Sequence, residues 1–301
     1  MKIGASNWYD LCMNIFKLSR SHFMKDHMTH TPKFSLLLCA LLAGTSAMAA
    51  DWSSNSLGYR YAPSQSEPGV SDKVSKNILS FTHVSGDSAG SNFFTIDLLK
   101  SDNSDPNNGG GAGAQEWYGF YQRNFSLSAM TGNKTGYGFA KDLSLTARFD
   151  AGTKNTTFAP SPFKVQLGVS AAMPVSAGFW DIGLAVYKES NNNGIVGKAV
   201  SFDAAPALNT AWAIPVGGVG TFTGFASVVG PKGKDGFGEQ TKTETLIRAN
   251  FMLDIGGAKS GLSAGVGVEY WDNKFGCDNS KSFVRNSCTA TTPLLLVEYK
   301  L

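Results

Sequence analysis

The sequence predicts an all-β protein, a transmembrane antiparallel up-and-down β-barrel of about 12 strands. Segments of about ten residues alternate between apolar and polar side chains, the pattern of strands with one face in lipid and the other in a lumen. Breaks rich in Gly, Asn, Ser and Pro separate these segments. After Asp51 there is no run of about 18 apolar residues, which a transmembrane helix requires. The low charge content, 16%, and the mean hydropathy of −0.11 also fit, because inward polar residues offset outward apolar ones.

Residues 1–50 are predicted to be a signal peptide, with extra residues in front of Met24. Residues 34–43 form a short apolar core, and Ala-Met-Ala at 47–49 supplies the small residues that a signal peptidase recognises. The apolar core is too short to cross a bilayer as a helix. We therefore expect export, with residues 51–301 forming the barrel in the outer membrane of a bacterial cell.

The positive charge of the chain belongs to this leader. Without residues 1–49, the 26 Lys and Arg lose five members and the 23 Asp and Glu lose two, so 21 of each remain. A net charge of zero gives no indication of nucleic-acid binding. We therefore expect no nucleic-acid partner.

The cysteines and the histidine limit the chemistry of the exported chain. Cys277 and Cys288 are the only cysteines after residue 49, and in an exported protein they are expected to form a disulfide; the alternative is two free thiols. His83 is the only histidine in the same part, so we expect no metal site and no cofactor. A barrel hydrolase or acyltransferase would need that histidine beside a serine or an acid. We expect a structural or interfacial role for His83 and no enzymatic activity.

Twelve segments have the two-residue period of strands. They cover residues 52–61, 77–85, 92–101, 115–127, 140–150, 163–173, 178–189, 198–212, 219–229, 242–254, 262–272 and 290–301. Long polar connections alternate with short ones, as in outer-membrane barrels, where the long loops face outward. The long loops are 62–76, 102–114, 152–162, 190–197, 230–241 and 273–289. With an even number of strands, both termini lie on the periplasmic side and the cysteine-containing loop lies outside.

Two connections depart from this simple scheme. Residues 128–139 form a longer link where a short turn is expected. Residues 71–76 are expected to form a short turn of helix within the first long loop. The remaining links, 86–91, 174–177, 215–218 and 255–261, are short.

The alternation assigns the faces of the strands. Outward positions are expected to be Leu143, Leu145, Ala147 and Phe149 in the fifth segment, and Trp180, Ile182, Leu184 and Val186 in the seventh. An Arg or Lys on the lipid face costs about 2–4 kcal/mol at mid-membrane, so the charged residues are assigned to the lumen. The last segment places Pro293, Leu295, Val297, Tyr299 and Leu301 on one face and Glu298 and Lys300 on the other. The segment 115–127 is aromatic on both faces and is left unassigned.

Ten residues are predicted to line the pore and contact a solute. They are Phe93, Asp97, Arg148, Asp181, Tyr187, Asp203, Phe225, Arg248, Glu269 and Trp271. The charges in the predicted lumen nearly balance, which favours neither an anion pore nor a cation pore. Aromatic faces stack on flat rings, by about 1–3 kcal/mol per base in nucleic-acid complexes, and carboxylates accept hydrogen bonds from hydroxyls. This combination suits a small neutral solute with one flat face; the alternative is that the aromatic residues only fill the barrel or sit at the membrane interface.

Two stretches resemble a known family. Residues 115–124 read Gln-Glu-Trp-Tyr-Gly-Phe-Tyr-Gln-Arg-Asn and are followed by Leu-Ser-Ala-Met-Thr-Gly at 127–132; residues 268–276 read Val-Glu-Tyr-Trp-Asp-Asn-Lys-Phe-Gly. Both resemble the Tsx family of nucleoside-specific outer-membrane channels and its vibrio OmpK relatives. The resemblance implies a monomeric twelve-stranded barrel with a narrow pore for nucleosides, and often a phage or colicin receptor role. The chain departs from the family in ending on Leu301 rather than on an aromatic residue.

The expected function is an outer-membrane channel for passive diffusion of small neutral solutes, with nucleosides as the specific expectation. The alternative is a structural or surface-receptor barrel whose loops bind a phage or an adhesion partner, without substrate-specific transport. The expected partners are outer-membrane lipid, a small-molecule solute and the barrel-assembly machinery, which would engage the C-terminal strand.

Overall fold

The computed structural model describes residues 50–301, except 258–259 and 282–284. The predicted signal peptide lies outside the described residues apart from Ala50. The described chain is all-β, with three short helical turns. Its strands are β1 (Trp52–Gln65), β2 (Val74–Asp87), β3 (Gly90–Ser101), β4 (Gln115–Ser126), β5 (Asp142–Lys154), β6 (Phe163–Ala172), β7 (Phe179–Asn193), β8 (Lys198–Ser201), β9 (Ala205–Val216), β10 (Gly220–Val229), β11 (Glu244–Asp254), β12 (Leu262–Asp272) and β13 (Ala290–Lys300). The helical turns are α3 (Leu127–Thr131), η1 (Lys274–Gly276) and α4 (Arg285–Cys288).

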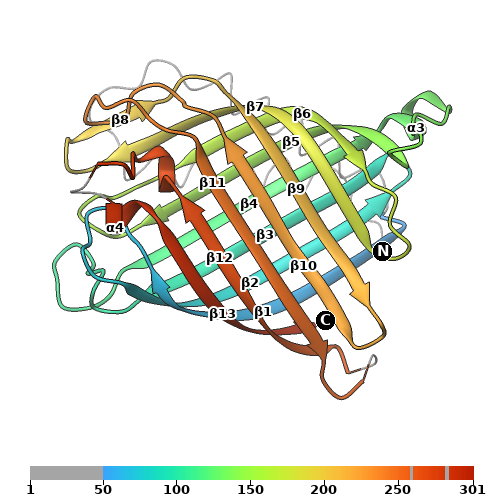
Figure 1. The fold of residues 1–301 in the computed structure, drawn as a ribbon, viewed down its shortest axis with the longest axis horizontal. Coiled ribbons are helices and arrows are strands. Elements are labelled where there is room, and N and C mark those ends of the chain that lie inside the picture. Colours follow the sequence, from blue (N-terminus) through green and yellow to red (C-terminus); the bar gives the residue numbers. More distant parts are fainter. Residues whose placement is uncertain (1–49, 258–259, 282–284) are drawn as a thin grey trace, which may run out of the picture. The chain divides into compact units, whose positions relative to one another are not determined.

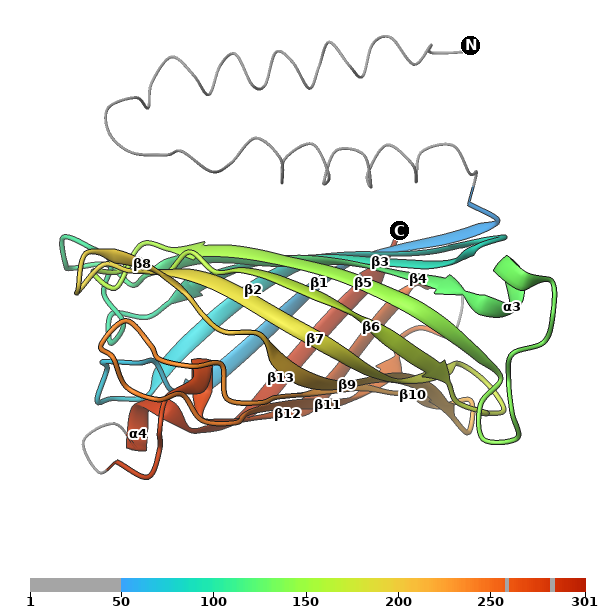
Figure 2. The ribbon, with the colours of Figure 1, turned by 90° about the horizontal axis from the view of Figure 1, so that it is seen from above.

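Twelve of these strands close into a ring. β1 to β7 pair antiparallel in chain order, β7 pairs with β9, β9 to β13 again pair in chain order, and β13 pairs with β1. β8 pairs only with the end of β7, over four residue pairs, and lies outside the ring. Figures 1 and 2 show the tilted strands wrapping around one axis. The prediction of a twelve-stranded up-and-down barrel is confirmed.

The two ends of the barrel differ. The connections after β1, β3, β5, β8, β10 and β12 lie at one end, which we call the outer end because it carries the long loops. The opposite end, the inner end, carries the short turns and α3, and it is where β1 begins and β13 ends (Figure 1). In the longer link at this end, Ser126 caps α3 by accepting a hydrogen bond from the Ala129 backbone N–H at 3.0 Å.

Two predicted elements are wrong in detail. The predicted strand 198–212 is divided into β8 and β9, because the chain turns at Phe202 and Asp203. The Phe202 backbone N–H donates to Glu189 O in β7 at 3.0 Å, and the Asp203 backbone N–H donates to Lys232 O, in the loop between β10 and β11, at 2.9 Å. The helical turn expected at 71–76 is absent, because Val74 already pairs with Gln65 as the first residue of β2.

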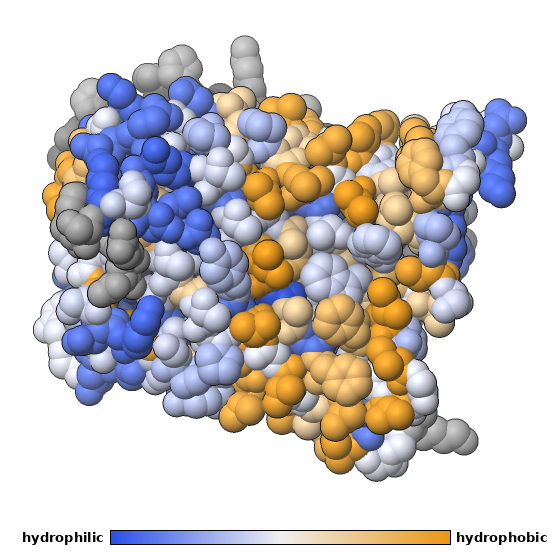
Figure 3. Space-filling view, viewed as in Figure 1, coloured by the Kyte–Doolittle hydropathy of each residue, from blue (hydrophilic) through white to orange (hydrophobic). Residues whose placement is uncertain are grey.

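The outer surface of the wall is apolar. Leu184 in β7 and Val266 in β12 are 62% and 60% exposed, and Leu79, Leu98 and Leu295 are similar. On the face shown in Figure 3, a broad apolar zone lies beside a polar region at the end that carries the long loops. A closed barrel satisfies all its backbone hydrogen bonds internally, so it can expose such a surface only to lipid. The wall of the barrel therefore faces membrane lipid, in agreement with the predicted location in the bacterial outer membrane.

Within residues 50–301 as described, none of the helices has the length and apolar content needed to cross a bilayer.

One part of the inner surface is apolar as well. Ile78, Leu294 and Leu296 are buried on the inner faces of β2 and β13, where they pack with Ala62, and Leu99 lies against this cluster. The alternation predicts the outer face of β13 correctly. For the inner face it identifies Glu298 and Lys300 and misses the buried Leu294 and Leu296. The lumen is therefore polar around most of its wall, with one apolar patch where Ala62, Ile78, Leu294 and Leu296 meet.

Candidate pore lining and outer mouth

Two arginines face the lumen with acids from other strands. Arg60 in β1 forms an ion pair with Asp97 in β3. Arg248 in β11 donates from Nε to Glu269 Oε2 in β12 at 2.8 Å, and Gln65 Nε2 donates to Glu269 Oε1 at 2.8 Å. The side chains of Arg60 and Arg248 are 12% and 21% exposed, so each still presents part of its surface to the lumen. Each pair is neutral, as the balanced composition predicts.

A flat stack lines the lumen beside these pairs. Phe93 and Phe120 stack with ring centroids 5.2 Å apart and an interplanar angle of 15°. The guanidinium of Arg148 lies 3.7 Å from the centre of the Phe120 ring, and it donates to both oxygens of Asp150, at 2.8 and 2.7 Å. Asp150 also accepts a hydrogen bond from Tyr118 Oη at 2.6 Å, so the stack has a fixed polar edge. Planar groups in such a row offer an apolar face with hydrogen-bonding groups at its rim.

A buried polar network occupies the outer part of the lumen. Tyr187 Oη donates to Glu189 Oε2 at 2.6 Å, and Lys232 forms an ion pair with the same carboxylate. Trp271 Nε1 donates to Glu244 Oε1 at 2.8 Å, and Glu244 lies 3.8 Å from the Lys232 ammonium. Lys232 comes from the loop between β10 and β11, so that loop folds inward onto the wall.

A second inward loop carries Glu67. This carboxylate lies between three ammonium groups, those of Lys76, Lys154 and Lys274, at 2.7 to 2.9 Å. Burial alone would raise the pKa of Glu67, but the three lysines lower it well below its usual range. Burial lowers the pKa of Lys274, and Glu67 offsets part of that effect.

All predicted pore residues except Asp203 lie on the inner face of the wall. Phe225 lies against Arg248, with its ring centre 5.2 Å from the guanidinium carbon. Tyr187 and Trp271 donate hydrogen bonds within the buried polar network around Lys232, so their polar atoms are already partnered. Asp181 lies near the start of β7, opposite Ala172. Asp203 is an exposed residue between β8 and β9, so its assignment to a wall strand is wrong.

Several residues of the lumen were not predicted. Tyr118 and Phe120 lie in the segment whose face could not be assigned, and Asp150 continues the inward alternation of Arg148. The same alternation extends to Lys154, two residues into a region predicted as loop, and would have identified that lysine. Nothing in the sequence places Glu67 inside the barrel, because its position depends on how its loop folds.

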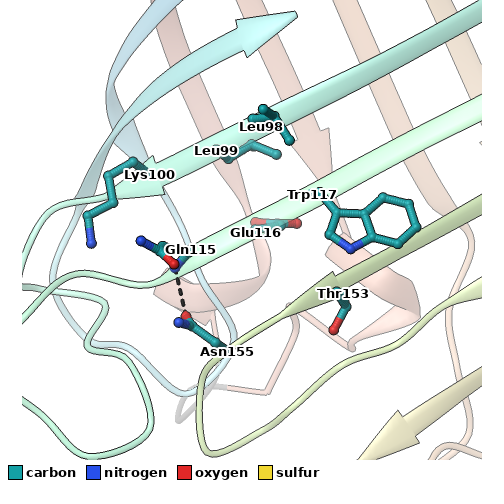
Figure 4. Close-up of a pocket in the computed structure, with 8 residues that line it drawn as sticks. All are labelled: Leu98, Leu99, Lys100, Gln115, Glu116, Trp117, Thr153 and Asn155. Carbon is teal, nitrogen blue, oxygen red and sulfur yellow. Dashed lines mark hydrogen bonds between the residues drawn. The ribbon is translucent and has the colours of Figure 1, made fainter.

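Two other features lie away from the lumen. A hollow on the outer ends of β3 to β5 is lined by Leu98, Lys100, Trp117 and Asn155, among others; Asn155 Oδ1 accepts from the Gln115 backbone N–H at 2.7 Å (Figure 4). Leu98 and Trp117 are exposed on the outside of the wall, so this hollow is no part of the pore.

His83 lies on the outer face near the inner end, with Nδ1 2.7 Å from Asn55 Oδ1. No group of three or more potential metal ligands occurs among the residues that the structure describes.

The predicted disulfide is confirmed. Cys277 and Cys288 are joined, with Cα atoms 5.9 Å apart, within the loop that links β12 to β13 at the outer end.

The chain resembles known barrels in fold at low sequence identity. For the KdgM porin, the identity is 10% and the TM-score 0.42, over 81% of this chain and 98% of that one. For the translocator domain of the autotransporter NalP from Neisseria meningitidis, the values are 12% and 0.40, over 88% and 95%. For OccK5 from Pseudomonas aeruginosa, they are 12% and 0.27, over 84% and 98%. No family model and no curated protein matches the chain.

Proposed function

We propose that the barrel is a passive outer-membrane channel for small neutral solutes, and that nucleosides are among them. The observation that supports this most is the row formed by Phe93, Phe120 and Arg148, with Asp150 and Tyr118 at its edge. A nucleoside has a flat base that can stack on such a row and hydroxyls that can accept from the Arg148 guanidinium, whose side chain is 21% exposed. The likeness of residues 115–124 to the Tsx family supports the same solute.

The charges of the lumen support a neutral solute. The pairs Arg60–Asp97, Arg248–Glu269 and Arg148–Asp150 each cancel, so no single-sign field selects an ion. We further propose that the channel acts as a monomer and that β13 is the strand the barrel-assembly machinery engages. Its place between β12 and β1 supports this, because it completes the ring.

The test is a planar-bilayer measurement with the refolded barrel. Added uridine should reduce the ionic current, and Phe120→Ala should weaken this block by about tenfold, because one stacking contact is worth about 1–3 kcal/mol. Phe222→Ala is the matched control, since Phe222 packs on Trp212 on the outer face, and it should leave the block unchanged. A current that ignores uridine would remove nucleosides from the proposal, and a barrel without current would remove the channel itself.

A further inference from the structure

The loop between β1 and β2 covers residues 66–73, and its first two residues lie inside the barrel. Ser66 and Glu67 are 1% and 4% exposed, whereas residues 71–73 are exposed. Ser66 Oγ donates to Thr289 O at 2.7 Å, which joins the base of the loop to the connection between β12 and β13. The buried start and the exposed remainder show that Glu67 is the residue that the loop delivers to the interior.

The three lysines around Glu67 come from opposite sides of the ring. Lys154 is the last residue of β5, and Lys274 follows β12 directly. From β5 to β12 the sheet order counts six steps in either direction, which is half of the ring. Lys154 reaches Glu67 Oε2 at 2.7 Å, and Lys274 reaches Oε1 at 2.9 Å. The Glu67 carboxylate therefore bridges opposite walls at the outer mouth.

The charge balance of this cluster depends on Glu67. Lys76 has a second acid, Glu116, at 3.0 Å, and Lys154 has Asp105 at 2.7 Å. In the described part of the chain, Lys274 forms an ion pair only with Glu67. Three lysines and three acids are neutral together, so withdrawal of Glu67 leaves one positive charge in excess.

Each lysine has an anchor outside the loop, although Lys274 Nζ also donates to Ser66 O within the loop, at 2.8 Å. Lys76 and Lys154 project from wall strands, and Lys274 is held over the ring of Trp271, 4.4 Å from its centre. Their side chains are 3% to 7% exposed. Buried ammonium groups in fixed positions require an anion between them. A small free carboxylate carries the same charged group as the Glu67 side chain that lies there.

We propose that Lys76, Lys154 and Lys274 form a carboxylate-binding site at the outer mouth, which Glu67 occupies as a tethered occupant and a small free carboxylate can occupy in its place. A tethered group competes at an effective concentration of about millimolar or higher, so the free carboxylate binds poorly while Glu67 is present. The loop 66–73 then narrows the mouth when Glu67 is bound and widens it when Glu67 leaves. The role of the site in permeation rests on the proposed channel function, but the binding itself does not.

Calorimetric titration of the refolded barrel with sodium acetate tests the site without requiring any current. Glu67→Ala should bind acetate at least about tenfold more tightly than the wild type. Glu239→Ala is the matched control, because Glu239 is 62% exposed on an outer loop and pairs only with Lys281 among the described residues, and it should bind as the wild type does. Adding Lys274→Met to Glu67→Ala should abolish the gain. Equal binding by the Glu67→Ala and Glu239→Ala variants would overturn the proposal.

Glu67→Gln provides a second test, because it keeps the side-chain volume while removing the charge. In a planar bilayer with a salt gradient, its reversal potential should shift toward anion selectivity relative to the wild type, since one lysine is uncompensated. An unchanged reversal potential would contradict the site. If neither the wild type nor the variant carries current while the Glu67→Ala variant binds acetate, the channel proposal fails and the carboxylate site stands.

Discussion

At the residue scale, the ion pair between Arg60 and Asp97 predicts how single charges affect the ion selectivity of the proposed channel. The two side chains neutralise each other across β2. Asp97→Asn leaves a positive group facing the lumen and should shift the reversal potential toward anion selectivity, whereas Arg60→Gln leaves a negative group and should shift it toward cation selectivity. Planar bilayers with a salt gradient measure both. Shifts of the same sign in the two variants would contradict the assignment of this pair to the pore.

Leu184 allows the same kind of test on the lipid side. It is 62% exposed on the outer face of β7. Leu184→Arg should lower the free energy of unfolding in lipid vesicles by about 2–4 kcal/mol, because an arginine at mid-membrane leaves water for hydrocarbon. Ile195→Arg is the control, since Ile195 is equally apolar and 58% exposed but lies in the turn between β7 and β8. Equal destabilisation by both changes would contradict the membrane position of β7.

At the scale of elements, the loop 66–73 is expected to respond to acid. The pKa of Glu67 is well below its usual range, so its ionised form contributes stability that is complete above the unfolded-state pKa and is lost as pH falls through the folded-state value. Conductance should therefore stay constant from neutral pH down to the usual glutamate range and change only in stronger acid. Recording single channels across this range measures the transition. The Glu67→Gln variant should lack that acid transition, and its persistence there would assign it to another group.

The disulfide is expected to stabilise one outer loop without holding the barrel together. It joins residues 11 apart in sequence, while β12 and β13 pair along their whole length. Cys277→Ser with Cys288→Ser should lower the free energy of unfolding by at most about 3 kcal/mol, through the loop entropy of the unfolded chain. Denaturant unfolding of the refolded barrel measures this cost. Far-UV circular dichroism should show unchanged strand content, and loss of the barrel signal would contradict the separation of loop and wall.

Element by element, the sequence predicts what depends on local alternation and misses what depends on contacts between distant segments. The period of two places Leu184 outside and Arg248 inside without any knowledge of their neighbours. The division between β8 and β9 could not be predicted, because it depends on Asp203 bonding to Lys232 of another loop. Glu67 could not be placed for the same reason, because it lies in a loop and the alternation ends with the strand.

At the scale of the whole molecule, the barrel and its membrane face follow from the sequence, whereas the shape of the pore does not. Balanced charge was predicted from composition, and the neutral pairs around Arg60 and Arg248 are the structural form of that balance. The apolar inner cluster at Ile78 and Leu294 was not predicted, because an apolar residue on an inward face is indistinguishable from a slip in register until the pairing is known.

Uptake of uridine into lipid vesicles tests the central claim most directly, because it measures passage of a neutral solute through the refolded barrel. Vesicles containing the barrel should take up uridine faster than empty vesicles, and faster than they take up a neutral disaccharide of larger size. Uptake no faster than that of empty vesicles would contradict the channel and favour a barrel whose function lies in its outer loops.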